Sequence, residues 1–263
     1  MSRDFELLRR AGSDRPSSLV DDAELFRFPR KSPLGKLSEQ IVNSNGVLQE
    51  IEEAGREEIA ALVTTVFGGP GPTLRRAVTF AGVQEPNTSA WVSATVAEML
   101  ASQAGSKVCL VDADTFRPRV HAYLQLPNVR GFADWLESTD NVAELPQRTG
   151  ENLWVLTAGK SRPTLPTERL RMVLDELESL FDHIVVSLPC ANTLAKLLPQ
   201  SQLTASLILV IEPNTLRAEA ENAKEELQAA GAQIIGAVLN ERTVTSRTVE
   251  EPVQDLGAAR PAA

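Results

Sequence analysis

The sequence predicts one α/β domain around a buried, mostly parallel and doubly wound sheet, preceded by an N-terminal helical extension. Two observations predict this fold. From Arg76 onward, short β-rich runs alternate with stretches of helical periodicity. The run Ile184-Val185-Val186 also lacks the polar alternation of a half-exposed strand, as expected where helices cover both faces. We therefore assign residues 75–240 to the α/β domain, 1–74 to the helical extension and linker, and 241–263 to a flexible C-terminal tail.

The predicted elements follow one another as βα units. In the extension we expect a short amphipathic helix in residues 1–12, a linker over 13–35, and one or two helices between Leu34 and Phe67. The predicted strands are Ala77–Ala81, Lys107–Val111, Leu153–Thr157, His183–Ser187, Leu207–Ile211 and Gln233–Leu239. The predicted helices are Thr88–Gln103, Thr167–Phe181 and Thr215–Ala230. Ligands of such sheets bind beyond the carboxyl ends of the strands, so the residues after each strand are the candidates for a site.

Composition excludes several classes of function. A formal net charge of -9 opposes broad electrostatic attraction to nucleic acid or anionic lipid. The longest purely apolar run, Leu207–Ile211, is too short to cross a bilayer, and the first residues lack an apolar signal-peptide core. Cys109 and Cys190 match neither a disulfide framework nor a zinc ligand set. We expect a cytoplasmic protein without direct membrane insertion and without a nucleic-acid partner.

The segment after the first predicted strand of the α/β domain stands where a Walker A loop would stand. Such a loop, G-x-x-x-x-G-K-[ST], cradles phosphates with backbone N–H groups and brings a lysine to the outer phosphates. Gly82 is present, but Pro86 replaces the second glycine and Asn87 replaces the lysine. Proline has no N–H and asparagine has no charge. Thr88 and Ser89 keep hydroxyls that can contact Mg²⁺ or cap the following helix.

Two aspartates follow the next predicted strand, and a serine ends the fourth. Asp112 and Asp114 precede Arg117-Pro118, and hard carboxylate oxygens in this position suit Mg²⁺ or the orientation of a nucleophile. The alternative is that an aspartate only caps the next turn. A Walker B strand ends in an aspartate that supports Mg²⁺, whereas here the position is Ser187. The acidic pair is thus the strongest candidate for retained chemistry.

Several segments together resemble the bacterial tyrosine kinases and related ATPases of capsule and exopolysaccharide biosynthesis, which share the P-loop class of the Min and Par positioning ATPases. The resemblance covers about residues 75–240, and its most specific element is the Asp112/Asp114 motif. The segments are Val78-Thr79-Phe80-Ala81-Gly82, Leu110-Val111-Asp112-Ala113-Asp114, Leu126-Pro127-Asn128, Gly131-Phe132-Ala133-Asp134, Leu156-Thr157-Ala158-Gly159 and Gly236-Ala237-Val238-Leu239-Asn240.

The resemblance implies a nucleotide site and also shows which of the site's usual residues are replaced in this chain. It implies that Asp112 and Asp114 form the second acidic motif, that Thr88 and Asp112 would hold Mg²⁺, and that Asn240 lies near the base. Active members carry lysine at Asn87, glycine at Pro86 and aspartate at Ser187. They also usually end in a tyrosine cluster, whereas Tyr123 is the one tyrosine of this chain. We therefore expect a vestigial nucleotide site, formed by Gly82, Pro86, Asn87, Thr88, Ser89 and Asn240, that binds no cofactor or only weak MgATP.

The resulting hypothesis is a pseudokinase or pseudo-ATPase that acts as a regulatory interaction module in polysaccharide synthesis or export. Its expected partner is a membrane polysaccharide co-polymerase, an exporter subunit, or an active kinase paralogue, which would hold it peripherally at the inner membrane. One alternative is an active ATPase or tyrosine kinase in which Asp112 and Asp114 hold Mg²⁺ and Arg117 or Lys160 supplies charge. Another is a Min/Par-like positioning ATPase.

Overall fold

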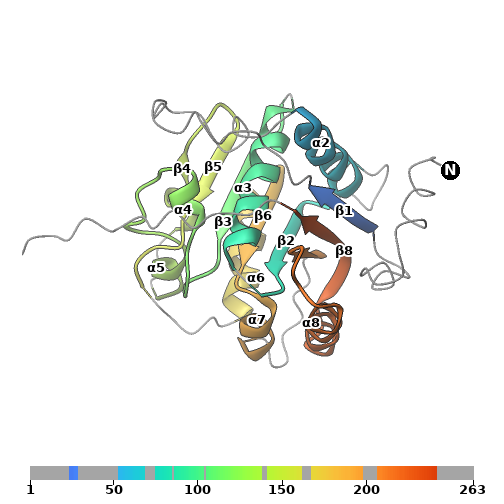
Figure 1. The fold of residues 1–263 in the computed structure, drawn as a ribbon. Helices are drawn as coiled ribbons and strands as arrows, with labels where there is room; N and C mark the ends of the chain where they lie inside the picture. The colour runs from blue at the N-terminus through green and yellow to red at the C-terminus, as the bar shows by residue number, and fades with distance from the viewer. Residues whose placement is uncertain are drawn as a thin grey trace, which may run out of the picture.

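The computed structural model describes residues 24–28, 53–68, 75–84, 86–103, 105–137, 141–161, 167–197 and 206–241. They form an eight-stranded sheet with the strand order β1-β8-β7-β2-β6-β3-β5-β4 (Figure 1). Every neighbouring pair is parallel except β4 and β5, which are antiparallel. The strands are β1 (Glu24–Phe28), β2 (Ala77–Gly82), β3 (Val108–Asp112), β4 (Gln147–Arg148), β5 (Leu153–Leu156), β6 (His183–Leu188), β7 (Ser206–Ile211) and β8 (Gln233–Asn240).

Helices cover both faces of this sheet. They are α2 (Glu53–Phe67), α3 (Pro86–Ser102), α4 (Val120–Tyr123), α5 (Phe132–Glu137), α6 (Thr167–Glu178), α7 (Ala191–Leu197) and α8 (Arg217–Ala229), with a 3₁₀ turn, η2, at Val142–Glu144. Helix α3 crosses the central strands β2, β3 and β6, with α2 beside it (Figure 1). The doubly wound, mostly parallel α/β architecture expected from the sequence is confirmed.

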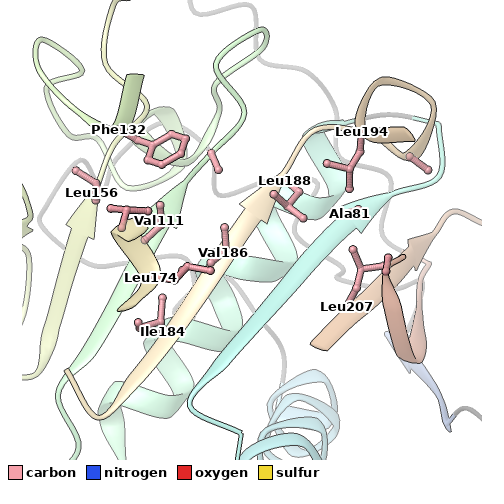
Figure 2. Packing of buried hydrophobic residues seen from close by; sticks show 14 of the residues in the cluster. Ala81, Val111, Phe132, Leu156, Leu174, Ile184, Val186, Leu188, Leu194 and Leu207 are labelled. Carbon is pink, nitrogen blue, oxygen red and sulfur yellow. The ribbon is translucent and has the colours of Figure 1, made fainter. Parts of the chain in front are cut away.

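Two apolar clusters form the core, one on each face. On one face, Phe132 of α5, Leu174 of α6 and Leu194 of α7 pack on the sheet (Figure 2). On the other face, residues of α2 and α3 such as Leu62 and Trp91 pack together against the strands. Successive residues of one strand alternate between the clusters, because side chains of a strand point to opposite faces. This explains why the central strands read as continuous apolar runs in the sequence.

All six predicted strands are present, and each end lies within one residue of the prediction. The linker predicted over residues 13–35 is wrong at Glu24–Phe28, which form β1 and pair in parallel with β8 from Gly236 to Asn240. A five-residue edge strand carries little periodic signal of its own, and its pairing depends on a partner more than 200 residues away in the sequence, from Glu24 to Gly236. The predicted helix in residues 1–12 lies outside the described residues.

Helix predictions were less accurate than strand predictions. The helix predicted over Thr167–Phe181 ends three residues earlier, at Glu178. At this end the Arg76 guanidinium donates hydrogen bonds to the carbonyl oxygens of Glu178 and Phe181, which a helix end leaves without helical partners. The short helices α4, α5 and α7 were not predicted, since helices of four to seven residues show almost no apolar period. No helix in the part of the chain that the structure describes is long and apolar enough to span a bilayer.

Candidate functional site

The predicted site residues lie at one edge of the sheet, beyond the carboxyl ends of neighbouring parallel strands. Strand β2 ends at Gly82 between β6, which carries Ser187, and β7, which leads into Glu212. Asp112 at the end of β3 is the register partner of Ser187 in β6. Parallel pairing therefore brings together groups that are far apart in sequence. The edge is the place where a sheet of this kind binds its ligand.

The segment after β2 has the strand–loop–helix form of a phosphate-binding loop. Strand β2 ends at Gly82 and helix α3 begins at Pro86, so the proline occupies the first turn, where its missing N–H is tolerated by the helix. Thr88 and Ser89 are buried in the next positions. The Ser89 hydroxyl donates to the carbonyl oxygen of Leu188 in β6, at 3.4 Å. The order of elements predicted for the slot is thus present.

Acidic residues after β7 meet this loop. The Thr88 hydroxyl donates a hydrogen bond to Oε1 of Glu212, the first residue beyond β7. Gln84 Nε2 donates to Oε2 of Glu219 in α8 at 2.7 Å. Sequence reasoning missed both acids, although Glu212 directly follows a predicted strand and so satisfied the criterion used for Asp112.

The loop that carries Glu212 is itself ordered by hydrogen bonds. The N–H of Glu212 donates to the Thr215 hydroxyl at 3.2 Å, and the N–H of Leu216 donates to the Glu219 carboxylate at 2.9 Å. Glu219 thereby caps the start of α8 and holds Gln84 at the same time. The contact between the β2 and β7 loops is thus built on a fixed backbone.

Asp112 is fully buried and its carboxylate organises the following loop. It accepts N–H hydrogen bonds from Asp114 at 3.2 Å, Arg119 at 3.1 Å and Val120 at 3.0 Å. Burial and, to a smaller extent, the charge of Asp114 raise the pKa of Asp112, the three N–H bonds oppose the shift, and the resulting pKa is about 7. Asp112 therefore shapes the backbone between β3 and the start of α4.

Asp114 has a similar backbone role. Its Oδ1 accepts from the N–H groups of Phe116 at 3.0 Å and Arg117 at 2.9 Å. Burial raises the pKa of Asp114, while these hydrogen bonds and the charges of Arg117 and Arg119 oppose the shift. The turn-capping alternative left open by the sequence is present in the geometry of both aspartates. Their role towards a metal ion stays a prediction.

Ser187, predicted to stand at the Walker B position, is buried, and its hydroxyl has no hydrogen-bond partner among the described residues. The carbonyl oxygen of Ser187 accepts from the N–H of Ala113 at 2.9 Å. Asn240 ends β8 and is also buried. Ile211 pairs with Leu239, so Asn240 and Glu212 each lie one residue beyond that pair. Asn240 thus shares the edge with the phosphate-loop slot.

A second polar network surrounds Asp134, beyond β5. Its carboxylate accepts from Gly131 N–H at 2.9 Å, Lys160 N–H at 3.3 Å and the Ser161 hydroxyl at 3.1 Å. The Asn128 amide and the backbone of Gly159 exchange two hydrogen bonds of 2.7 and 3.0 Å. Asn128, Gly131, Asp134 and Gly159 belong to the segments that carry the family resemblance. Their hydrogen bonds join the two loops.

No metal-binding group made of three or more His, Cys, Asp or Glu side chains occurs within the described ranges. Thr88 and Glu212 nevertheless present the hard oxygen atoms that Mg²⁺ prefers. Proteins usually hold Mg²⁺ through one or two carboxylates, waters and substrate phosphates instead of a full protein cage. The donor set therefore fits Mg²⁺ brought in with a nucleotide.

Comparison with known proteins identifies bacterial tyrosine-protein kinases as relatives. The putative tyrosine-protein kinase CapB of Staphylococcus aureus is 30% identical over 149 residues, which are 54% of this chain and 65% of CapB. The tyrosine-protein kinase ptk of Acinetobacter johnsonii is 24% identical over 70% of this chain and 26% of ptk. The chain thus spans less than two thirds of the length of both relatives. No family model matches it.

Solved structures of kinase domains share the fold. The kinase domain of the Escherichia coli tyrosine kinase ETK superposes with a TM-score of 0.72 and 22% identity, covering 89% of this chain and 97% of that domain. The chimerical protein CapA2B2 superposes with a TM-score of 0.62 and 24% identity, covering 70% of this chain and 83% of the chimera. The fold is therefore that of a bacterial tyrosine-kinase domain.

Proposed function

We propose that this relative of the bacterial tyrosine-protein kinases is a pseudokinase, or pseudo-ATPase, acting as a regulatory interaction module in capsule or exopolysaccharide synthesis and export. The observation that carries the proposal is the phosphate-loop slot, where strand, loop and helix are in place but Pro86 and Asn87 replace glycine and lysine. The slot lacks one backbone donor and its one positive charge. A phosphate at this helix start would lose both contacts.

The physics of phosphoryl transfer supports a loss of activity. The reaction depends almost wholly on positioning and on stabilising negative charge, with little covalent work for the protein. Loss of one donor to the developing charge costs about 3 kcal/mol in known cases, which is a factor of about 10² in rate. Asn87 and Pro86 remove two such contributions, and the carboxylates of Asp112 and Asp114 accept backbone N–H groups.

One observation favours the alternative of an active ATPase or kinase with an unorthodox site. The pKa values of Asp112 and Asp114 are both raised at the edge that binds ligands in this fold, and perturbed carboxylates gather at functional sites. In that case Arg117 or Lys160 would supply charge. We rank this alternative second because the turn-capping contacts of both aspartates give them a structural purpose.

The partner we propose is a membrane polysaccharide co-polymerase, an exporter subunit or an active kinase paralogue. The similarity to CapB supports this choice of system. We further propose that the protein works in the cytoplasm and reaches the inner membrane through that partner.

Titration calorimetry with MgATP tests the proposed function. The natural chain is expected to show no saturable heat up to millimolar MgATP, because the slot lacks the lysine and the second glycine. CapB, assayed in parallel, serves as the comparison protein. A micromolar dissociation constant, which corresponds to about −8 kcal/mol, would overturn the pseudokinase proposal. Mass spectrometry after incubation should likewise find no phosphate on Tyr123.

A further inference from the structure

We propose that Glu212 takes over the role of the missing Walker B acid. The groups that would hold Mg²⁺ are then kept, although the groups that would bind phosphate are lost. This inference rests on the proposed function, since it concerns the same vestigial site. It is carried by the hydrogen bond that the Thr88 hydroxyl donates to the Glu212 carboxylate. Neither the sequence motifs nor the resemblance assigned any role to Glu212.

The topology makes this substitution possible. Strand β2 lies between β6 and β7, and both strands point their carboxyl ends at the loop after β2. Ser187 in β6 pairs with Phe80, and Val210 in β7 pairs with Gly82. A carboxylate two residues beyond Val210 can therefore reach Thr88 from the opposite side. The acid has moved from one neighbour of β2 to the other.

The chemistry of the hydroxyl group explains what Glu212 does. A threonine hydroxyl has one hydrogen to donate and two lone pairs to offer. When its hydrogen is bound to Glu212, the lone pairs of Thr88 stay available for a cation. A bond from hydroxyl to carboxylate also increases the electron density on the hydroxyl oxygen. The contact thus positions Thr88 as a magnesium ligand.

Ser187 cannot supply this effect. Its hydroxyl is buried without a partner among the described residues and carries no charge. Glu212 by contrast is half-buried, and Thr215 fixes its backbone N–H while Glu219 holds Gln84 of the same loop. Glu212, and not Ser187, therefore supplies the negative charge for a divalent cation at Thr88.

The experiment uses the full chain with Pro86→Gly and Asn87→Lys, which introduces the glycine and the lysine that would bind phosphate and leaves Ser187 unchanged. ATP affinity is measured by calorimetry with Mg²⁺ and with EDTA. We expect Mg²⁺ to tighten ATP binding at least tenfold in this double variant. Adding Glu212→Gln should reduce that ratio below threefold. Glu221→Gln is the control and should keep the ratio, because Glu221 lies in α8, which follows the Glu212 loop, and its carboxylate pairs with Arg217 at 2.7 Å.

A rescue variant separates the role of Glu212 from damage to the loop. Ser187→Asp added to the Glu212→Gln variant should restore the magnesium ratio to at least tenfold, because the acid then returns from β6. An unchanged ratio after Glu212→Gln, tighter ATP binding in that variant, or no magnesium dependence in the folded double variant would each overturn the inference. MgATP binding by the natural chain instead tests the proposed function, so the two failures are distinguishable.

Discussion

Two loop regions at the same edge of the sheet use their polar groups differently. Beyond β5, the Asp134 carboxylate accepts three hydrogen bonds from the two loops that it joins. Beyond β2, Thr88 donates to Glu212, just after β7, and Gln84 donates to Glu219 of α8. The adjacent Pro86 and Asn87 lack the groups that phosphate needs.

The two regions differ in how far their polar groups are used within the chain. The Asp134 network is complete within the chain, so it stabilises the fold whether or not a nucleotide binds. After β2, by contrast, the Thr88 hydroxyl and the Glu212 carboxylate that it contacts still offer oxygen atoms suited to a cation. A chain of this class can therefore keep its fold while the phosphate contacts are lost.

The largest effect should come from breaking the Asp134 region with Gly159→Ala. Gly159 has φ +84, and a Cβ there would overlap the Asp134 carboxylate and displace its hydrogen bonds. Backbone strain of about 1–2 kcal/mol and the loss of three hydrogen bonds of about 1 kcal/mol each predict a loss of about 4–5 kcal/mol in unfolding free energy. Urea denaturation measures it.

Gly105→Ala is the matched control for this prediction. Gly105 has φ +92, but its added Cβ would meet no heavy atom within 4 Å among the described residues beyond Gly105 and its two chain neighbours. Its loss should therefore stay near the backbone strain alone, about 1–2 kcal/mol. Equal losses in both variants would mean that the Asp134 contacts contribute nothing beyond the glycine conformation.

The pH dependence of stability should reveal the buried Asp112. Its pKa is raised in the folded protein from 3.8 to about 7, so the folded state binds a proton more tightly than the unfolded state. Stability should then fall as pH rises through this window, with the protonated form favouring the fold at low pH. Between pH 5 and 7 the contribution is about 2 kcal/mol. Asp112→Asn should remove that part of the slope.

Glu58 contributes to the same pH window and has to be separated. Burial and the charge of Glu241 raise the pKa of Glu58 to about 7 as well. The urea titrations are therefore run with and without Glu58→Gln. If Asp112→Asn leaves the slope unchanged in both backgrounds, Asp112 is ionised throughout the range and its three N–H bonds outweigh its burial.

The fold could be predicted from the sequence where helices show apolar periodicity over several turns and where strands are buried on both faces. The central strands, such as His183–Leu188, are buried on both faces and read as apolar runs. Strand β1 could not be predicted in this way, because five residues at a sheet edge receive their structure from pairing with β8. Helix α4 has only four residues and depends on N–H bonds from its first turn to Asp112.

The location of the site at the strand ends could be predicted from the sequence, but the side-chain contacts within it could not. The rule that ligands bind beyond strand ends found Thr88 and Asp112 correctly as members of one edge. It did not find Glu212, because the search followed a known motif in which the acid comes from β6. Which neighbour of β2 supplies a carboxylate depends on strand order, and no local pattern encodes that order.

The smallest effect, and one of opposite sign, should come from Ser187→Ala. The Ser187 hydroxyl is buried without a hydrogen-bond partner among the described residues, and an unsatisfied buried polar group costs about 1–3 kcal/mol. Alanine keeps nearly the same shape, so the variant should be more stable by about 1 kcal/mol in urea denaturation. Thr79→Val is the matched control, since the equally buried Thr79 hydroxyl donates to the Ser206 carbonyl oxygen at 3.2 Å and its removal should destabilise by about 1 kcal/mol. A destabilised Ser187→Ala variant would show that this hydroxyl has a hydrogen-bond partner in solution. The contrast between Ser187 of β6, without a partner, and Glu212 beyond β7, which accepts from Thr88, would then be wrong.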